Sequence, residues 1–557
     1  MSQVHISKDT AHVDRYVLDN LPKSKHLPEL IYDRPEICYP DRLNCIQELL
    51  LCHRENGHHG QIAIKSPDQQ WTYQELIDRA SRVAEALTED LSFVPGNRVL
   101  LHGYNSPMTI AIWCGVLMAG GIVVATMPML RSMEIIKVCD KAKINFIMSD
   151  VRMMDEIEKV HCHVNDVQTH FYNGRPALSE VTDFESLLQT KSGTFDVVDT
   201  ASDDPAIIAF TSGTTGQPKG CVHFHKDLLA ISDAYAVPIL NPKIDDVFLG
   251  TPPIAFTFGL GASVIFPLRA GACSLLLEKS SPADLLDAVS RYGVTTIFTA
   301  PTAYQRMLPL LENYDLAGLR HCVSAGETLS ASIWQRWRSF TGIKIAEGIG
   351  STEMLHIFLA SPAAEARAGA TGKILPSYQA CVVDEKMQPV PDGEIGFLAV
   401  RGPTGCRYLD DDRQREYVKQ GWNVTGDTYV RDHEGYYTYQ ARADDIIVSS
   451  GYKISGPEVE GVLLDHPAID ECAVIAVPSV ERGFDIKAFI VLSQNEDRST
   501  VMAEQLKTHV QEYLARYKCP HHITFVTNLP RTGTGKLQRY VLRQQERDAQ
   551  SMPSVAE

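Results

Sequence analysis

The sequence lacks paired cysteines. Its thirteen cysteines stand singly between Cys38 and Cys519, and no CxxC pair occurs among them. A disulfide framework or a zinc finger needs cysteines at short, fixed spacings, so neither is predicted. We expect reduced and mostly buried thiols, as in a cytoplasmic protein.

Positive charge is also scarce. The chain has 52 lysines and arginines against 69 aspartates and glutamates, which gives a formal net charge of −17. A field of this sign repels the phosphate backbone, so binding to nucleic acid through the overall charge is not expected. A local basic pocket for a small anionic ligand remains compatible with this composition.

Long hydrophobic runs are scarce as well. The first residues, MSQVHISKDTAHVDRY, contain no apolar core of the kind found in secretory signals, and none is expected here. Residues 108–130 carry no charged side chain, a run longer than the ~18 residues that usually indicate a membrane span. Gly120 and Gly121 divide this run into a helix-length part and the short β-branched part IVVA. We therefore expect a buried helix followed by a buried strand, and no membrane contact.

The chain shows no internal repeat or low-complexity tract, and its 557 residues exceed the ~250–300 that one core supports. Short β-rich runs alternate with amphipathic stretches of helical length through most of it. The runs are NRVLLHG, NFIMSD, AIIAFTSG, CSLLLEK, TTIFTAP and HCVSAGE. This alternation predicts an α/β protein with largely parallel sheets, in which ligands bind at the carboxyl ends of strands.

The pattern changes after about residue 380. Short alternating runs with turn residues at Asp392-Gly393 and Glu434-Gly435 predict a small antiparallel β unit. Strands and helices resume beyond residues 442–445 and predict a compact α+β unit. We therefore predict a large N-terminal domain at residues 1–441 and a small C-terminal domain at residues 442–557.

The segment TSGTTGQPKG, residues 211–220, follows one of the predicted buried strands. Its three glycines let backbone N–H groups approach an anion, and its four hydroxyl side chains and Lys219 are donors for phosphate oxygens. The spacing differs from that of the P-loop, because Lys219 follows Pro218 and precedes Gly220. A flexible surface loop is the alternative interpretation, and the position directly after a buried strand disfavours it.

Two histidine clusters raise the question of a metal site. They are HCH at residues 161–163 and CVHFH at residues 221–225. Cys221, His223 and His225 share one face of a strand, but neither cluster has zinc-finger spacing. Packing of a strand beside the phosphate loop explains the second cluster better than a metal does.

Six motifs in order resemble those of the adenylate-forming superfamily, which includes acyl- and aryl-CoA synthetases, nonribosomal adenylation domains and beetle luciferases. They are TSGTTGQPKG (211–220), SAGETLS (324–330), EGIGSTEM (347–354), GWNVTGD (421–427), ARADDIIVSSGYKISGPEVE (441–460) and RTGTGKLQR (531–539). The motifs span more than half of the chain. The resemblance implies that a carboxylate attacks the α-phosphate of ATP, that pyrophosphate leaves, and that a thiol captures the acyl-adenylate.

The resemblance also implies which residues contact the nucleotide. The phosphates are held by Thr211, Ser212, Gly213, Thr214, Thr215, Gly216 and Lys219. The adenine side is formed by Gly326, Glu327, Glu347, Gly348, Ile349 and Gly350. Asp427 accepts both ribose hydroxyls, and Arg442 touches the nucleotide. Thr352 lies near the phosphates, and Glu353 is a ligand of Mg²⁺, which prefers such carboxylates.

The C-terminal motifs carry the remaining roles that the resemblance implies. Lys536 is the lysine of adenylation, where its compact positive charge meets the negative charge that develops at the α-phosphate. Asp444 is the hinge about which the small domain swings between the two half-reactions. Ser450 and Gly451 line the tunnel for the pantetheine arm of CoA.

The acid is predicted from four positions in two segments. Phe258 occupies the acyl-pocket aromatic position of the family, with Thr257 beside it, and Ile349 and His356 belong to a segment similar to the benzoate-CoA ligase branch. Such a flat slot suits an aromatic ring. His356 is a candidate for a hydrogen bond to an ortho substituent, and packing in the core is the alternative. We expect an aryl acid, with 2-aminobenzoate first and benzoate or hydroxybenzoate next.

Two rival functions remain open at this point. An adenylation module would pass the acyl group to a carrier protein in place of CoA. A binding protein would keep the fold without catalysis, although the presence of Lys536, Glu353 and Asp427 argues against it. The expected partners are an aromatic acid, ATP, Mg²⁺ and CoA, and the expected state is a monomer or a homodimer in the cytoplasm.

Overall fold

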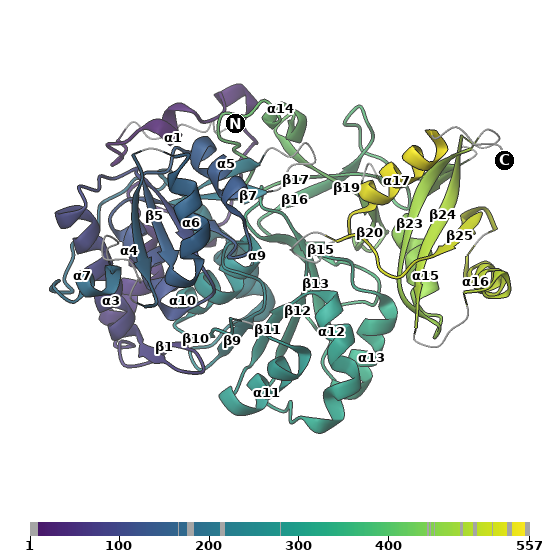
Figure 1. Cartoon of the computed structure of the whole chain (residues 1–557), viewed down its shortest axis with the longest axis horizontal. Coiled ribbons are helices and arrows are strands. Elements are labelled where there is room, and N and C mark those ends of the chain that lie inside the picture. Colours follow the sequence, from purple (N-terminus) through teal and green to yellow (C-terminus); the bar gives the residue numbers. More distant parts are fainter. Residues whose placement is uncertain are drawn as a thin grey trace.

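The computed structural model describes residues 9–164, 166–174, 183–211, 218–278, 280–442, 445, 447–449, 452–479, 483–493, 498–514, 516–531 and 537–551. Over these residues the strands form two large sheets, an antiparallel sheet and two small C-terminal sheets. The C-terminal elements lie to one side of the rest of the chain, next to the antiparallel sheet (Figure 1). The predicted α/β fold, with its mixed and largely parallel sheets, is confirmed.

The first large sheet has the strand order β6-β5-β3-β4-β7-β8. All of its neighbouring pairs are parallel except β7 and β8, which are antiparallel. The carboxyl ends of the parallel strands, including the end of β7 that precedes the predicted phosphate loop, therefore meet at one edge. Its strands are β3 (Arg98–His102), β4 (Ile122–Thr126), β5 (Phe146–Asp150), β6 (Gln168–Tyr172), β7 (Pro205–Thr211) and β8 (Lys219–Phe224).

The second large sheet has the order β15-β14-β13-β12-β11-β9-β10-β1-β2. Its central pairs are parallel, and β2, β14 and β15 extend it in antiparallel fashion. Its strands are β1 (Ile62–Lys65), β2 (Gln70–Thr72), β9 (Val247–Gly250), β10 (Cys273–Leu275), β11 (Thr296–Thr299), β12 (His321–Ser324), β13 (Ile345–Gly350), β14 (Ile357–Ala360) and β15 (Lys373–Ile374). Helices α11 (Pro282–Tyr292), α12 (Pro301–Met307) and α13 (Ala331–Thr341) connect several of them.

The uncharged run at residues 108–130 forms the predicted helix and strand. Helix α4 (Pro107–Met118) is buried along its whole length, and the chain turns at Gly120 into β4. A helix covered on all sides needs no polar face, which explains the lack of charge. No helix in the described part of the chain has the length and apolarity that a bilayer crossing requires.

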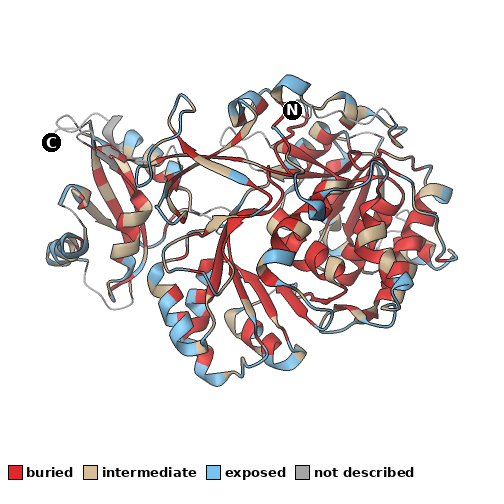
Figure 2. Ribbon diagram, turned by 180° about the vertical axis from the view of Figure 1, so that it is seen from behind, coloured by how far each residue is buried: buried red, intermediate tan, exposed pale blue. Residues whose placement is uncertain are grey.

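Helix α3 (Tyr73–Glu85) packs beside α4 and shows how local sequence sets the elements. Thr72 and Glu75 form a capping box, in which the Thr72 side chain accepts from the Glu75 N–H and the Glu75 carboxylate accepts from the Thr72 N–H. Leu76, Ile77 and Ala80 lie on the buried face at helical spacing. Buried residues concentrate in this way in the strands and on the inward faces of helices (Figure 2).

The antiparallel unit predicted after residue 380 is present. It has the order β16-β17-β19-β18, and β20 also pairs with β19, along the edge opposite β17. Its strands are β16 (Gln379–Val383), β17 (Gly396–Arg401), β18 (Val418–Lys419), β19 (Trp422–Arg431) and β20 (Tyr437–Arg442). The turn at Glu434-Gly435 lies between β19 and β20, and Gly435 has a φ of 82°, which favours glycine.

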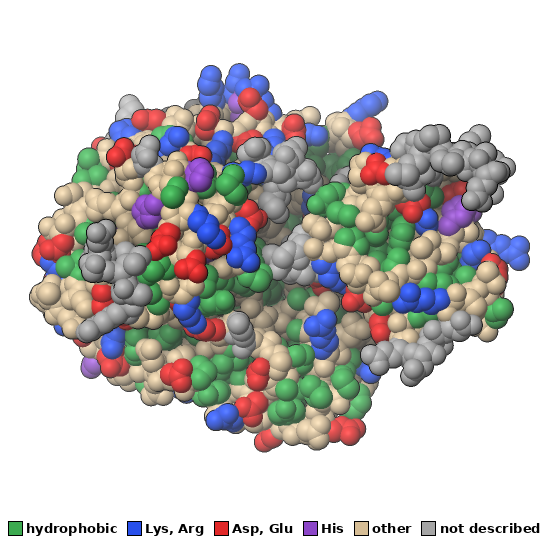
Figure 3. Space-filling view, in the orientation of Figure 1, with side chains coloured by type: hydrophobic (Ala, Val, Ile, Leu, Met, Phe, Trp, Pro, Cys, Tyr) green, Lys and Arg blue, Asp and Glu red, His purple; other side chains and the backbone are tan. Residues whose placement is uncertain are grey.

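The C-terminal elements follow β20. Strands β23, β24 and β25 form one sheet, and α15 packs on β23. These elements are β21 (Ile447–Ser449), β22 (Tyr452–Ile454), α15 (Gly456–Leu464), β23 (Ile469–Ser479), β24 (Gly483–Leu492), α16 (Thr500–Tyr513), β25 (His522–Phe525) and α17 (Arg539–Ser551). On the face shown in Figure 3, basic and acidic side chains are interspersed over both parts of the molecule.

Candidate active site

Strands β7 and β8 hold the two ends of the predicted phosphate loop side by side. Their register pairs Thr211 with Lys219 and Phe210 with Gly220. Lys219 is half-buried, and its ammonium group donates a hydrogen bond to the Tyr408 hydroxyl over 2.9 Å. Ser212, Gly213, Thr214, Thr215 and Gly216 lie outside the described residues.

The segment at residues 406–409 adds to the free edge of β8. The Val222 N–H donates to the Arg407 carbonyl over 2.8 Å, and the Leu409 N–H donates to the Gly220 carbonyl over 2.9 Å. This pairing places Tyr408, which is 1% exposed, next to Glu353. The Tyr408 hydroxyl donates a hydrogen bond to the Glu353 carboxylate. Sequence reasoning missed Tyr408, because only a contact between distant segments brings it here.

Glu353 lies in a tight turn between β13 and β14. A Cβ atom on Gly350 would stand 2.5 Å from the His356 carbonyl oxygen, so this close approach requires glycine. Leu355 adopts a left-handed φ of 69°, an unusual conformation for a branched residue. The His223 Nε2 atom lies 2.8 Å from the Thr352 carbonyl oxygen and fixes the turn to β8. Thr352 and Glu353 are thus brought beside Lys219.

A buried ion pair lies at the end of β8. The Arg407 guanidinium donates to the Asp227 carboxylate over 2.7 Å, and both side chains are at most 1% exposed. Asp227 also accepts from the Phe224 N–H over 3.0 Å, at the junction of β8 and α8 (His225–Ile231). Although burial opposes ionisation, the positive charge of Arg407, helped by His223, lowers the pKa of Asp227 to about 2.

The predicted adenine-side residues meet at the carboxyl ends of β12 and β13. Ser324 pairs with Glu347 in register, and Gly326 follows with a φ of 90°. Glu327 comes next on the same connection. The Leu329 N–H donates to the Glu347 carboxylate over 3.1 Å. Because Glu347 is buried, with this one hydrogen bond as a smaller opposing effect, its pKa rises to about 7.

We predict that Glu347→Gln gains stability relative to the wild type as the pH rises from 5 to 8. The folded state holds the Glu347 proton more tightly than the unfolded chain, so its contribution is present below pH 4.5 and is lost as the pH rises through about 7. Glutamine does not titrate and keeps the acceptor for the Leu329 N–H. The difference in unfolding free energy should change by about 2.5 kcal/mol over this range. Urea unfolding at each pH measures it, and a pH-independent difference would refute it.

Asp427 and Arg442 face each other on β19 and β20. The two residues are paired in register, and the Arg442 guanidinium donates to the Asp427 carboxylate over 3.0 Å. The Asp427 side chain is 13% exposed and that of Arg442 is 52% exposed. The pair therefore lies at the end of the antiparallel sheet from which the chain continues to the C-terminal elements (Figure 1).

Two of the residues predicted to bind the acid, Phe258 and His356, belong to an aromatic cluster. Phe258 and Thr257 begin α9 (Thr257–Leu260), and the Phe258 and His356 rings are 5.7 Å apart. Phe266 meets His356 edge-on at 4.6 Å, and Tyr235 lies 5.4 Å from it. Ile349 and Phe258 both pack against the same hydrophobic core.

His356 is the polar member of this cluster. It is 2% exposed, and within the described part of the chain neither ring nitrogen has a hydrogen-bond partner of ordinary geometry, although the Phe258 backbone lies close enough to interact electrostatically. Burial lowers the pKa of His356 to about 3, so the ring is neutral. A Cβ atom on Gly261 would stand 2.4 Å from the ring, so only glycine allows this approach. Sequence reasoning did not identify Tyr235, whose hydroxyl also lacks a partner among the described residues.

Comparison with protein families gives two matches. A model described as AMP-binding enzyme matches residues 52–408, and a model described as AMP-binding enzyme C-terminal domain matches residues 458–536. The first match alone covers more than half of the chain. The chain belongs to the AMP-binding enzyme family. The resemblance found in the six motifs is therefore confirmed.

Several members of the AMP-binding enzyme family are similar over nearly their whole length. Benzoate–CoA ligase from Thauera aromatica is 33% identical over 518 residues, which are 91% of this chain and 97% of that protein. The solved structure of the anthranilate CoA ligase AuaEII in complex with anthranoyl-AMP has a TM-score of 0.88 at 30% identity, covering 93% of this chain and 100% of that chain. A benzoate CoA ligase from Burkholderia xenovorans LB400 has a TM-score of 0.82 at 31% identity, covering 90% and 100%.

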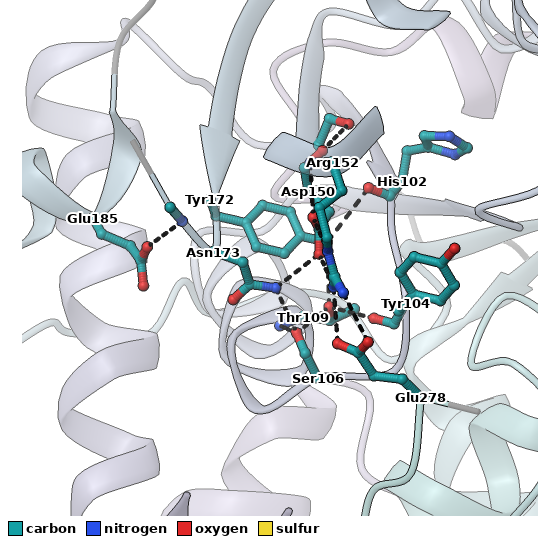
Figure 4. Close-up of polar contacts among 12 residues, drawn as sticks. His102, Tyr104, Ser106, Thr109, Asp150, Arg152, Tyr172, Asn173, Glu185 and Glu278 are labelled. Carbon is teal, nitrogen blue, oxygen red and sulfur yellow. Dashed lines mark hydrogen bonds and ion pairs between the residues drawn. The ribbon is translucent and has the colours of Figure 1, made fainter. Parts of the chain in front are cut away.

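Arg152 and Glu278 join the two large sheets. Arg152, just after β5, donates to the Asp150 carboxylate and, with both terminal nitrogens at 2.8 Å, to Glu278, which follows β10 (Figure 4). Asp150 is fully buried and also accepts from Asn173 over 2.9 Å. The Arg152 guanidinium stacks on the Tyr104 ring at 4.7 Å. Arg152 thus ties the carboxyl edge of the first sheet to the second.

The two histidine clusters take part in packing and backbone contacts. His223 reaches the Thr352 carbonyl, and His225 Nδ1 accepts from the Cys45 N–H over 3.2 Å. His163 lies at the surface, against the Lys159 carbonyl. In the ranges that the structure describes, no three histidine, cysteine, aspartate or glutamate side chains are grouped to hold a metal ion.

The C-terminal site residues fall largely outside what the structure describes. Lys536, Asp444, Ser450 and Gly451 lie outside the described residues. Arg531 and Leu537, on either side of residues 532–536, are described and pair with each other in an antiparallel bridge. The Gln538 N–H donates to the Pro530 carbonyl over 2.9 Å, and the Arg531 guanidinium donates to Glu471 over 2.9 Å. The base of the predicted lysine loop is therefore attached to β23.

Proposed function

We propose that the chain is an ATP-dependent, AMP-forming CoA ligase for an aryl acid. One observation carries the proposal. His356, whose ring lies beside that of Phe258, is in the same turn between β13 and β14 as Glu353, and Glu353 faces Lys219. An aromatic acid seated on this cluster has its carboxylate beside the groups that would hold the phosphates. The benzoate– and anthranilate–CoA ligases among the relatives support this choice of acid.

The reaction has two half-reactions that use one site. The substrate carboxylate attacks the α-phosphate of ATP, the P–O bond to the β-phosphate breaks, and pyrophosphate leaves. The CoA thiol, after losing its proton, attacks the acyl carbon, and AMP leaves with the electron pair of the acyl–oxygen bond. Positioning and neutralisation of charge supply most of the catalysis in such a transfer. The similarity to the benzoate– and anthranilate–CoA ligases extends over almost their full length. A carrier protein as the acceptor of the acyl group is therefore not favoured.

We propose the following nucleotide roles. Thr211, Lys219 and the loop between them would hold the β- and γ-phosphates. Gly326, Glu327 and the end of β13 (Glu347, Gly348, Ile349 and Gly350) would contact the adenine. Asp427 would accept the ribose hydroxyls, with Arg442 beside it.

A divalent cation fits the donor set at the turn. Glu353 offers a carboxylate that is 7% exposed and lies 3.8 Å from Lys219, with Thr352 next to it, and Mg²⁺ prefers such oxygen ligands. When bound with ATP, Mg²⁺ supplies charge neutralisation on the phosphates. Glu353 would hold and orient it.

The small C-terminal part would serve both half-reactions by moving about Asp444. Residues 442–557 would act as the mobile domain that brings Lys536 to the α-phosphate. Ser450 and Gly451 would then line the path of the pantetheine arm in the second half-reaction. The attachment of the loop base to β23 through Arg531 means that Lys536 would move with the domain.

The preferred acid carries a hydrogen-bonding ring substituent, with 2-aminobenzoate first and benzoate or hydroxybenzoate next. Neutral His356 can donate from one ring nitrogen and accept at the other, so it can bind an amino or hydroxyl group. Thr257, 8% exposed, adds a hydroxyl beside Phe258. The test is a panel of ring-substituted benzoates and a fatty acid, assayed for AMP formation with and without CoA. Activity with the fatty acid and with no aryl acid would overturn the proposal.

We predict that His356→Leu lowers the preference for 2-aminobenzoate over benzoate about tenfold. A hydrogen bond between the substituent and the imidazole is worth about one power of ten in discrimination, and leucine removes it while keeping the site apolar. The kcat/KM values for both acids measure the preference. His170→Leu is the matched control, because His170 is also buried and its ring nitrogens have no hydrogen-bond partner among the described residues, but it lies in β6. An unchanged ratio would assign His356 to packing alone.

A further inference from the structure

Tyr408 stands between the two charged groups that would meet the phosphates and the metal ion. Its hydroxyl donates to the Glu353 Oε1 atom and accepts from the Lys219 Nζ atom at 2.9 Å. Lys219 and Glu353 are 3.8 Å apart, too far for a direct hydrogen bond. A phenol has one donor and two acceptor lone pairs, so one hydroxyl can satisfy both partners.

Besides its ring, over which the Lys219 Nζ atom lies at 4.8 Å from the centre, Tyr408 is held by contacts that involve neither charged group. Its N–H donates to the Gln414 side-chain oxygen over 2.8 Å, and Gln414 in turn donates to the Cys406 carbonyl over 3.0 Å. The Tyr417 ring meets it edge-on at 5.9 Å. The residue also pairs with Cys221 of β8 through its backbone. The hydroxyl is therefore presented from a rigid support, at a place set by β8.

A lysine and a glutamate this close in a buried setting attract each other strongly, because screening by water is weak. A direct ion pair between Lys219 and Glu353 would point the ammonium and the carboxylate at each other and away from a ligand. With the hydroxyl between them, the ammonium and the carboxylate are each held by a weaker and neutral partner. Both remain available when a magnesium-bound phosphate chain arrives.

We propose that Tyr408 is a positioning residue that keeps Lys219 and Glu353 apart and aimed at the magnesium-bound pyrophosphate part of ATP. The proposal rests on the proposed function for the roles of Lys219 and Glu353. Tyr408 acts only through these two groups and does not touch the reacting carboxylate or the α-phosphate. Its effect is thus confined to the phosphate and metal end of the ligand.

The test measures binding to the purified chain by calorimetry, with magnesium pyrophosphate and AMP as separate probes. Tyr408→Phe keeps the ring and removes the hydroxyl. We expect about tenfold weaker binding of magnesium pyrophosphate, the usual loss for one hydrogen bond to a charged group, and a change of less than about twofold for AMP. The KM for MgATP in ATP–pyrophosphate exchange should rise by a similar factor, with the KM for the acid unchanged.

Tyr73→Phe is the matched control. Tyr73 is fully buried, and its hydroxyl donates to the Ala272 carbonyl over 2.8 Å, away from Lys219 and Glu353. It should lower the thermal unfolding midpoint to an extent comparable with Tyr408→Phe and leave both binding constants unchanged. A loss of magnesium pyrophosphate binding in this control as well would assign the effect to general destabilisation.

A double-mutant cycle with Lys219→Met separates positioning from a structural role. If Tyr408 acts through Lys219 and Glu353, adding Tyr408→Phe to Lys219→Met should weaken magnesium pyrophosphate binding by clearly less than it does in the wild-type background, because only the contact with Glu353 is left to lose. Additive losses, equal weakening of AMP binding, or wild-type affinity in Tyr408→Phe would each overturn the proposal. The binding measurements are made without an aryl acid, so their outcome does not depend on which acid the wild type activates.

Discussion

Lys536→Ala is expected to slow acyl-adenylate formation by about 10²–10³-fold and to leave thioester formation from supplied acyl-AMP within about threefold of the wild type. A preorganised charge at the site where negative charge develops is worth about this much in kcat. The α-phosphate reacts only in the first half-reaction, so the second does not need the lysine. ATP–pyrophosphate exchange measures the first half-reaction, and release of AMP from synthetic acyl-AMP plus CoA measures the second.

Lys507→Ala is the control for this experiment. Lys507 belongs to the same C-terminal part, on α16, and pairs with Glu504 at the surface over 2.9 Å. Its loss should change neither half-reaction by more than about twofold, because such exposed pairs contribute little. Equal damage to both half-reactions by Lys536→Ala would contradict the role assigned to Lys536.

Asp227→Ala is expected to destabilise the protein by about 3–5 kcal/mol. The substitution leaves the Arg407 guanidinium buried without its partner, since that side chain is 1% exposed and its 2.7 Å contact is with Asp227. It also removes the acceptor for the Phe224 N–H at the end of β8. Urea unfolding monitored by tryptophan fluorescence measures the loss as a shift of the midpoint.

The comparison for Asp227→Ala is Asp287→Ala, which breaks an exposed ion pair. Asp287 and Arg291 lie one helical turn apart on α11, with side chains 46% and 66% exposed. Their separation should cost less than about 1 kcal/mol. A loss of similar size for both variants would mean that burial of the Asp227–Arg407 pair is not what stabilises β8 and the segment of Tyr408.

Much of the fold could be predicted because the local pattern of apolar and polar residues agrees with the burial of each segment in the folded chain. The run at residues 108–130 lacks charge because α4 is buried all round, and each of the six β-rich runs forms a strand at or near its predicted bounds. The site loops could be placed because glycine and turn chemistry fix where strands end. Gly350 shows this, since its place beside the His356 carbonyl admits no side chain.

The supports of the site could not be predicted in the same way. Tyr408 reaches Glu353, and Arg407 reaches Asp227, because residues 406–409 pair with β8, almost two hundred residues earlier in the chain. No local period or spacing encodes such a pairing. Arg152 and Glu278 likewise meet across two sheets. Sequence motifs therefore predict the groups that would face the ligands, and the structure adds the buried groups Tyr408, Arg407 and Asp227 beside them.

The most direct test of the central claim is the stoichiometry of one reaction. The purified chain is incubated with 2-aminobenzoate, ATP, Mg²⁺ and CoA, and AMP, pyrophosphate and the aryl-CoA ester are quantified together. We expect equal amounts of all three products, with no ADP. Formation of ADP, or of AMP and pyrophosphate without any aryl-CoA ester from any benzoate tested, would contradict it.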